Sequence, residues 1–118
     1  MSDIYSYKHK VQYYETDQMG VVHHSNYIRW FEEARMHFLE DIGFPYAKVE
    51  ALGIIIPVLG VSAKYRTMVK YGETVDIYSK ITKFNGLKMD IAYRVVDHAT
   101  GVIRCTGESS HAFLDKEY

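Results

Sequence analysis

Residues 25–42 read SNYIRWFEEARMHFLEDI, and this stretch decides the fold because it is the one long segment with a helical pattern. Its apolar side chains recur three or four positions apart, the spacing of one face of an α-helix. The stripe consists of Tyr27, Phe31, Ala34, Phe38 and Ile42, widened by Ile28, Trp30, Arg35 and Leu39. We expect Ser25 or Asn26 to cap the start of this helix and Gly43 to end it. A stripe this wide predicts a helix that a sheet covers on more than one side.

The chain on both sides of this helix has the pattern of extended strands. Residues 4–14 read as a first strand, and residues 45–52 as a short second helix. Later apolar and β-branched runs predict strands over 54–71, 74–84, 87–97 and 102–114. Asn85-Gly86 predicts a two-residue hairpin with positive φ tolerated at both positions, residues 98–101 predict a second turn, and Pro57 predicts a bulge or sheet edge. The order favours an α+β fold in which a curved antiparallel sheet of about five strands wraps one long central helix.

The composition is that of one ordered domain, residues 1–118. Hydrophobic residues make up 47% of the chain, and 14 Lys and Arg balance 15 Asp and Glu, which disfavours disorder and nucleic-acid binding through bulk charge. One cysteine, Cys105, excludes an internal disulfide and is expected to be a buried inert thiol. No apolar run approaches the ~20 residues of a membrane span, and residues 1–10 lack a signal-peptide core, so we expect a cytoplasmic protein.

Residues 14–27, YETDQMGVVHHSNY, place a carboxylate, a glycine turn and a helix start in quick succession. The first amides of a helix carry about half a positive charge and can stabilise an oxyanion. Asp17, a few residues upstream, can face the same point in space as the helix start near His24. An Asp with a pKa near ~3.9 is ionised at neutral pH, as a nucleophile or a base needs. The spacing fits an acyl-transfer site, although an Asp before a helix is more often a turn residue or a cap.

This segment resembles the signature of the hotdog-fold thioesterases of the 4-hydroxybenzoyl-CoA thioesterase and short-chain acyl-CoA thioesterase group. The resembling positions are Asp17, Gly20, Val21, Val22, His23, His24, Asn26 and Tyr27, and the run WFEEAR at 30–35 also looks like the family's helix. The likeness is specific from about Tyr13 to Arg35 and extends over nearly the whole chain by length and element order. It implies a hotdog fold and the hydrolysis of acyl-CoA to a carboxylic acid and CoA, with no cofactor besides the substrate's own coenzyme A.

The resemblance also implies roles for individual residues. Asp17 would be the catalytic carboxylate, acting as nucleophile or as general base, and the helix start near His24 would polarise the thioester carbonyl. The residues that would shape the substrate pocket are Gly20, Val21, Val22, His23, Asn26 and Tyr27; position 23 is often Tyr in such relatives. Lys64 and Arg66 are candidates for holding CoA phosphates, since phosphate recognition favours Lys and Arg, although a solvated strand face explains them equally well.

Other interpretations of the same residues stay open. Glu15 could be coupled to Asp17 or support it, but a solvated side chain is the simpler interpretation. His23 and His24 are adjacent, and no cysteine spacing supports zinc, so no metal is expected. The alternative functions are a hotdog hydratase or dehydratase that uses His24, and a non-catalytic acyl-CoA-binding module. A lone hotdog would expose sheet edges, so we predict a homo-oligomer, a dimer or more specifically a tetramer built from dimers, as the resemblance also implies.

Overall fold

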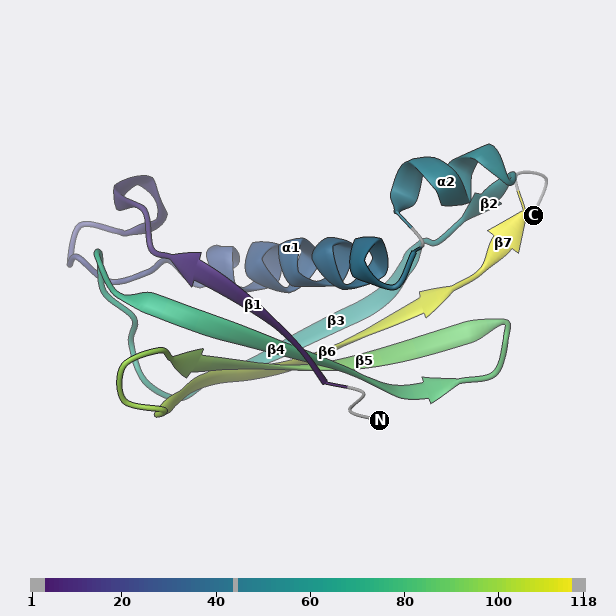
Figure 1. Ribbon diagram of the computed structural model, residues 1–118. Helices are drawn as coiled ribbons and strands as arrows, with labels where there is room; N and C mark the ends of the chain where they lie inside the picture. Colours follow the sequence, from purple (N-terminus) through teal and green to yellow (C-terminus); the bar gives the residue numbers. More distant parts are fainter. Residues whose placement is uncertain (1–3, 44, 116–118) are drawn as a thin grey trace.

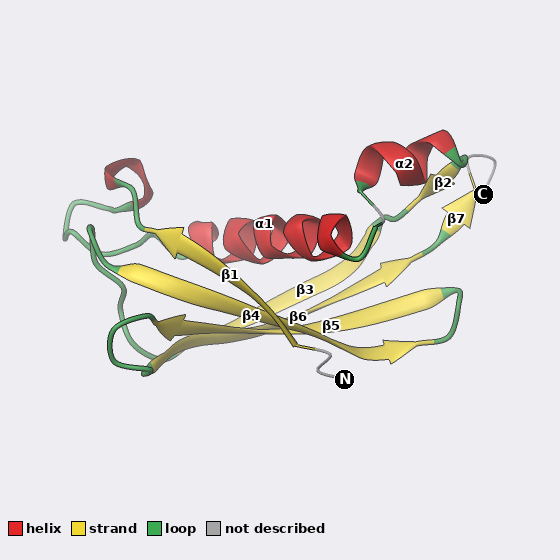
Figure 2. Ribbon diagram, viewed as in Figure 1, coloured by secondary structure: helices red, strands yellow, loops and turns green. Residues whose placement is uncertain are grey.

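The long helix α1 (Ser25–Asp41) lies across one face of a five-stranded antiparallel sheet in a computed structural model that describes residues 4–43 and 45–115 (Figure 1). The strands are β1 (Ile4–Lys10), β3 (Val58–Tyr65), β4 (Thr74–Phe84), β5 (Lys88–Asp97) and β6 (Ile103–Ala112), in the spatial order β1-β4-β5-β6-β3. A short 3-10 helix η1 (Tyr13–Glu15) lies at the N-terminal end of α1, whereas α2 (Tyr46–Ala51) and the ribbon of β2 (Ile54–Ile55) and β7 (Leu114–Asp115) lie at the other end (Figure 2).

The core forms where the apolar stripe of α1 meets the inner face of the sheet. Trp30, Phe31 and Ala34 are almost fully buried there. The Phe31 ring stacks on Tyr93 of β5 with ring centroids 4.5 Å apart. Gly107 of β6 makes this approach possible, because a Cβ at that position would overlap the Phe31 ring. The wide stripe seen in the sequence is therefore the side of α1 that the sheet covers.

Most predicted elements are confirmed, but the predicted strand over 54–71 is instead two strands, β2 and β3, followed by a non-strand segment from 66 to 73. The first strand is also shorter than expected. β1 ends at Lys10, and Tyr13 and Tyr14 lie in η1, where each residue is 77% exposed. The strand stops because the Gln12 amide donates to the Glu15 carboxylate at 2.8 Å, which closes a helical turn. The aromatic residues that resembled a strand in the sequence are therefore surface residues of that turn.

The start of α1 also differs from the prediction. His24, with a helical backbone, occupies the cap position, so Ser25 and Asn26 already lie inside the helix. The Ser25 hydroxyl lies 2.9 Å from Nδ1 of His23, and the Asn26 side chain donates to the Glu15 carbonyl at 2.9 Å. Both side chains are thus used to hold the preceding loop rather than to cap the helix.

The predicted hairpin turn has the expected place with one change of detail. Gly86 has a φ of +87°, but Asn85 does not adopt a positive φ. Instead, its side-chain oxygen accepts the amides of Leu87 at 2.9 Å and Lys88 at 2.8 Å. Pro57 directly precedes β3, which lies at the sheet edge and has an irregular register at its start, so that prediction is confirmed.

Two further observations concern predictions made from composition. Cys105 is fully buried on β6, as expected, and burial raises the pKa of its thiol to about 11. Within residues 4–43 and 45–115, no helix is both long and apolar enough to cross a membrane.

Candidate active site

The segment between η1 and α1 folds back on itself as a tight loop. Thr16 and Val22 pair as an isolated antiparallel bridge, and the Asp17 amide donates to the Val21 carbonyl at 2.9 Å. Gly20 turns the loop with a φ of +77°, a conformation that side-chain-bearing residues rarely adopt. The predicted glycine turn is therefore a backbone requirement rather than a contact surface.

This loop is fastened to the segment that follows β3. Val21 pairs with Lys70, and the Val22 amide donates to the carbonyl of Val69 at 2.8 Å. Val69 is fully buried, so the attachment is made at the edge of the core. The loop that carries Asp17 is held on both sides by backbone hydrogen bonds.

The Asp17 side chain is only partly engaged by this loop. Its Oδ1 accepts the amide of Met19 at 2.8 Å and, more weakly, the amide of Val21 at 3.4 Å. Its second oxygen, Oδ2, makes no hydrogen bond to any residue in the described ranges 4–43 and 45–115. The carboxylate is therefore oriented through one oxygen and leaves the other available to a bound molecule.

The N-terminal end of α1 offers one unoccupied backbone donor. The amides of Asn26 and Tyr27 donate to the carbonyls of His23 and His24, and the amide of Ser25 donates to Nδ1 of His23. The His24 amide, in contrast, has no acceptor within the described part of the chain. A helix N-terminus with a free amide can stabilise negative charge on a ligand oxygen.

Asp17 and His24 line the same cleft, which has a volume of about 360 Å³. The other residues that line it are Met19, Val21, Val22, His23, Tyr27, Tyr65, Arg66, Thr67 and Met68. Seven of the predicted site residues are therefore brought together: Asp17, Val21, Val22, His23, His24, Tyr27 and Arg66.

Four lining residues are not among the predicted site residues, namely Met19, Tyr65, Thr67 and Met68. Tyr65 is the most informative of them, because its hydroxyl donates to the His24 carbonyl at 3.3 Å. Its ring also packs edge-on against Tyr27, with centroids 5.1 Å apart, and burial raises the pKa of Tyr27 to about 12. Both phenols therefore stay neutral near pH 7. In the sequence, the alternation of side chains along β3 was the one signal that could have placed Tyr65 on this face of the sheet.

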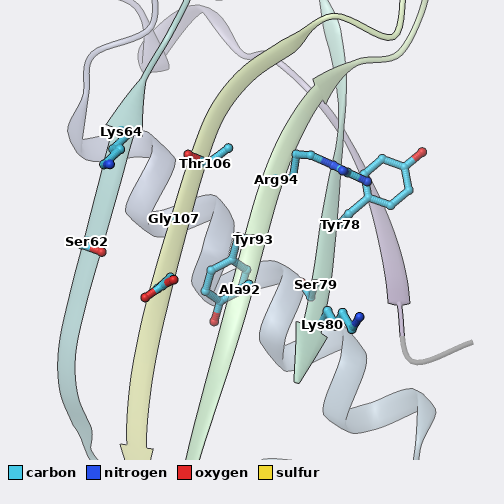
Figure 3. A pocket seen from close by; sticks show the side chains of 11 residues that line it. Ser62, Lys64, Tyr78, Ser79, Lys80, Ala92, Tyr93, Arg94, Thr106 and Gly107 are labelled. Carbon is cyan, nitrogen blue, oxygen red and sulfur yellow. The ribbon is translucent and has the colours of Figure 1, made fainter. Parts of the chain in front are cut away.

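Lys64 is not brought to the cleft. Successive residues of a strand point to opposite faces, so Tyr65 faces the helix side and Lys64 faces the outer side of the sheet. There Lys64 lines a separate groove of about 640 Å³ together with Tyr78, Lys80 and Arg94 (Figure 3). Of the cationic residues predicted to hold phosphates, only Arg66 lies at the cleft.

Gly20 and Asn26 also do not line the cleft, but both shape its walls. Gly20 turns the loop, and Asn26 joins the helix start to η1 through the Glu15 carbonyl. Glu15 itself is 5% exposed, so the expectation of a solvated side chain is wrong. The reason is the three hydrogen-bond donors, His9, Gln12 and Trp30, that surround its carboxylate.

No group of three or more His, Cys, Asp or Glu residues within 4–43 and 45–115 has a geometry that could hold a metal ion. His23 and His24 stack with ring centroids 4.2 Å apart, and the His23 ring is engaged by Ser25. Both histidines line the cleft together with Asp17.

Comparisons with known proteins give this chain a family context. Residues 11–117 match the sequence model of the family described as the thioesterase-like superfamily. The chain is 38% identical over 108 residues to YneP of Bacillus subtilis, a provisionally named acyl-CoA thioesterase, covering 92% of this chain and 78% of that protein. It is 26% identical over 88 residues to the acyl-CoA thioester hydrolase YbgC of Escherichia coli, covering 75% of this chain and 66% of that protein.

Solved structures agree with these sequence matches. The DHNA-CoA thioesterase of Staphylococcus aureus superposes with a TM-score of 0.90 at 31% identity, covering 97% of this chain and 76% of that one. A hypothetical protein of Thermus thermophilus superposes with a TM-score of 0.88 at 37% identity, covering 93% of this chain and 82% of that one.

Proposed function

The chain belongs to the thioesterase-like superfamily, has the hotdog fold and is a thioester hydrolase, and from this premise we propose that it hydrolyses acyl-CoA with Asp17 as its catalytic carboxylate. The observation that carries the proposal is the shared cleft of about 360 Å³, in which a half-free carboxylate and a free helix-terminal amide lie together. These are the two groups that acyl transfer needs, since one supplies the attack and the other holds the developing negative charge.

In the proposed reaction the thioester carbonyl oxygen accepts a hydrogen bond from the His24 amide at the start of α1. Asp17 then acts in one of two ways. As a nucleophile, its free oxygen bonds to the acyl carbon, the carbon–sulfur bond breaks, and water later hydrolyses the mixed anhydride. As a general base, it takes a proton from a water molecule whose oxygen bonds to the acyl carbon; the carbon–sulfur bond then breaks, and the proton passes to the leaving thiolate. Both routes consume one water and release a carboxylic acid and the thiol of CoA.

The His24 amide is proposed to contribute most in the transition state. Removing a single oxyanion donor typically costs about 2.7–4 kcal/mol of transition-state stabilisation. A backbone donor cannot be deleted by exchanging its side chain, so Asp17 is the position at which substitution is informative. Arg66, the cation that lines the cleft, is proposed to hold a phosphate of the CoA moiety.

A homodimer through β3 is proposed as the assembly unit, and a pair of such dimers as the tetramer. β3 pairs with β6 on one side and ends the five-stranded sheet on the other. Its residues Val58, Leu59 and Val61 are between 46% and 55% exposed, and they form an apolar edge that a second copy of the same strand would cover. Light scattering would give at least twice the chain mass, and Val61→Lys would shift the mass towards that of one chain. A parent protein with the mass of a single chain would contradict the proposal.

The proposed activity is tested by thiol release from a panel of acyl-CoAs, from acetyl to palmitoyl and including benzoyl and 4-hydroxybenzoyl. Thiol release with at least one member supports hydrolysis. Crotonyl-CoA is the discriminating substrate, because a hydratase would consume its double bond without releasing thiol. Hydration of crotonyl-CoA with no thiol release from any substrate would overturn the proposal. A cytoplasmic location stays a prediction.

A further inference from the structure

Glu15 is a buried carboxylate that the proposed mechanism does not use. It accepts three hydrogen bonds: from Nε2 of His9 at 2.8 Å, from the Gln12 amide at 2.8 Å and from Nε1 of Trp30 at 2.6 Å. An ionised carboxylate can only accept, so Nε2 of His9 carries the proton. The three donors come from β1, the start of η1 and α1, and one side chain therefore joins three separate elements.

The backbone of Glu15 is engaged as fully as its side chain. Its carbonyl accepts the amide of His23 at 2.9 Å and the side-chain amide of Asn26 at 2.9 Å. His23 directly precedes His24, and Asp17 lies two residues after Glu15. Glu15 thus contacts the chain immediately beside both groups of the proposed site.

We infer that Glu15 is the positioning residue that fixes the Asp17 carboxylate relative to the His24 amide. The inference rests on the proposed function, because it assigns a task to Glu15 only if those two groups react together. The side chain anchors the Asp17 loop to β1 and α1, while the carbonyl of the same residue anchors the helix start. One residue therefore sets the distance between attacking group and oxyanion donor, without touching the substrate itself.

The charge of Glu15 matters for this task. Burial alone would raise the pKa of Glu15, but the hydrogen bonds from Gln12, His9 and Trp30 outweigh burial and hold the pKa below its usual value. A glutamine has nearly the same shape, yet its amide nitrogen would face a donor where Glu15 presents an oxygen. Glu15→Gln therefore breaks part of the network while keeping the volume, and the loop is expected to shift.

The matched control is Glu33, a second carboxylate close to the same histidine. Its Oε2 lies 3.8 Å from Nδ1 of His9 and accepts the Tyr7 hydroxyl at 3.3 Å. No hydrogen bond to Glu33 among the described residues comes from the loop of 16–24, so Glu33→Gln removes a charge beside His9 and leaves the loop anchored.

The experiment compares the parent with Glu15→Gln, Glu33→Gln and Trp30→Phe on the best acyl-CoA. We expect Glu15→Gln to lower kcat by about 10- to 100-fold with KM within about twofold, since misplacing reacting groups by about 1 Å costs on the order of 10²-fold. Trp30→Phe removes one donor and should give a smaller loss of kcat of about three- to tenfold. Glu33→Gln should match the parent. A purely structural role would instead lower the folded fraction and leave kcat per folded molecule unchanged.

Fluorescence supplies a readout that does not depend on turnover. Trp30 is the chain's single tryptophan, so its emission reports on the Glu15 contact directly and should change in Glu15→Gln but not in Glu33→Gln. A Glu15→Gln variant with the parent's kcat, or with a loss that disappears after correction for the folded fraction, overturns the inference. Full activity of Asp17→Asn would instead defeat the proposed catalytic assignment, so the two failures are distinguishable.

Discussion

His111 is fully buried on the inner face of β6, and its burial predicts a specific loss of stability in mild acid. Nε2 of the ring lies 2.7 Å from the Ser109 hydroxyl, which lies 2.7 Å from the Tyr93 hydroxyl. Burial and the positive charge of Arg35 lower the pKa of His111 from 6.5 to about 4, although Asp90 acts in the opposite direction. The folded protein therefore holds a neutral ring at pH values where the unfolded chain holds a protonated one.

The direction in which stability changes with pH follows from proton uptake by the unfolded chain. Between pH 6.5 and about 4 the unfolded chain binds a proton at His111 that the folded protein does not, so the free energy of unfolding falls as the pH falls. The difference between a pKa of 6.5 and one of about 4 is worth roughly 3 kcal/mol once both states have titrated. Between pH 7 and pH 4.5 His111 alone should therefore remove roughly 2 kcal/mol.

Urea unfolding at pH 7 and pH 4.5, at one protein concentration, measures this loss. His111→Gln cannot titrate in this range, so its loss between the two pH values should be smaller than the parent's by roughly 2 kcal/mol. The exposed His37 gives the control, because His37→Gln deletes one ring without altering the core. Equal losses in the parent and in His111→Gln would refute the reasoning. If His111→Gln does not fold, an NMR titration of the His111 ring in the parent decides, and a midpoint near 6.5 would refute it equally.

Three further substitutions test the packing and polar contacts of the fold. Gly107→Ala places a methyl group against the Phe31 ring, so thermal unfolding should show a loss of about 1–3 kcal/mol, and an unchanged Tm would contradict the packing. Arg104→Met leaves Asp97, whose carboxylate lies 2.8 Å from Nη2 of the arginine, buried without its cation. Arg104→Met should lower the free energy of unfolding by about 3 kcal/mol at pH 7. The loss should be smaller in strong acid, because Arg104 holds the pKa of Asp97 far below its usual value. A loss that does not depend on pH would count against the ion pair. Asn85→Ala removes two bonds to turn amides and should cost about 1 kcal/mol in urea unfolding, whereas no change would show that the turn does not need the side chain.

The parts of the fold that the sequence predicts best are those where one local signal suffices. The stripe of α1 predicts the helix to within a residue of its end at Asp41, and β4 spans the predicted residues 74–84. Gly43 and Gly101, with φ values of +91° and +77°, end elements where turns were expected. In each case the periodicity and the turn residue indicate the same element boundary, so the boundary can be predicted without knowledge of tertiary contacts.

Glu15 shows where local signals fail. Nothing near it in the sequence indicates that His9 and Trp30, on two other elements, will surround its carboxylate. A charged residue in a loop is normally solvated, and only the packing of β1 against α1 reverses that expectation. The early end of β1 has the same origin, because the Glu15 carboxylate closes the turn that begins at Gln12.

Lys64 and Tyr65 show a second limit, that of register. The two residues are adjacent, so one must face the helix and the other must face outward. The residue types do not determine which of the two faces the helix. The register does, because Tyr65 pairs with Cys105 and Lys64 pairs with Thr106 on β6. Cys105 is fully buried, which places its partner on the helix side and at the cleft. The signature-like segment extends over residues 13–35, but β3 supplies part of the cleft from outside that segment.

The measurement that tests the central claim most directly is kcat for thiol release by Asp17→Asn on the best acyl-CoA of the panel. Asparagine keeps the shape of the side chain but neither attacks the acyl carbon nor takes a proton from water. Glu50→Gln, which neutralises an exposed carboxylate on α2, serves as the matched control. We predict a loss of at least about 10²-fold in kcat for Asp17→Asn and none for Glu50→Gln. An Asp17→Asn variant that turns over like the parent would contradict the assignment of Asp17 as the catalytic carboxylate.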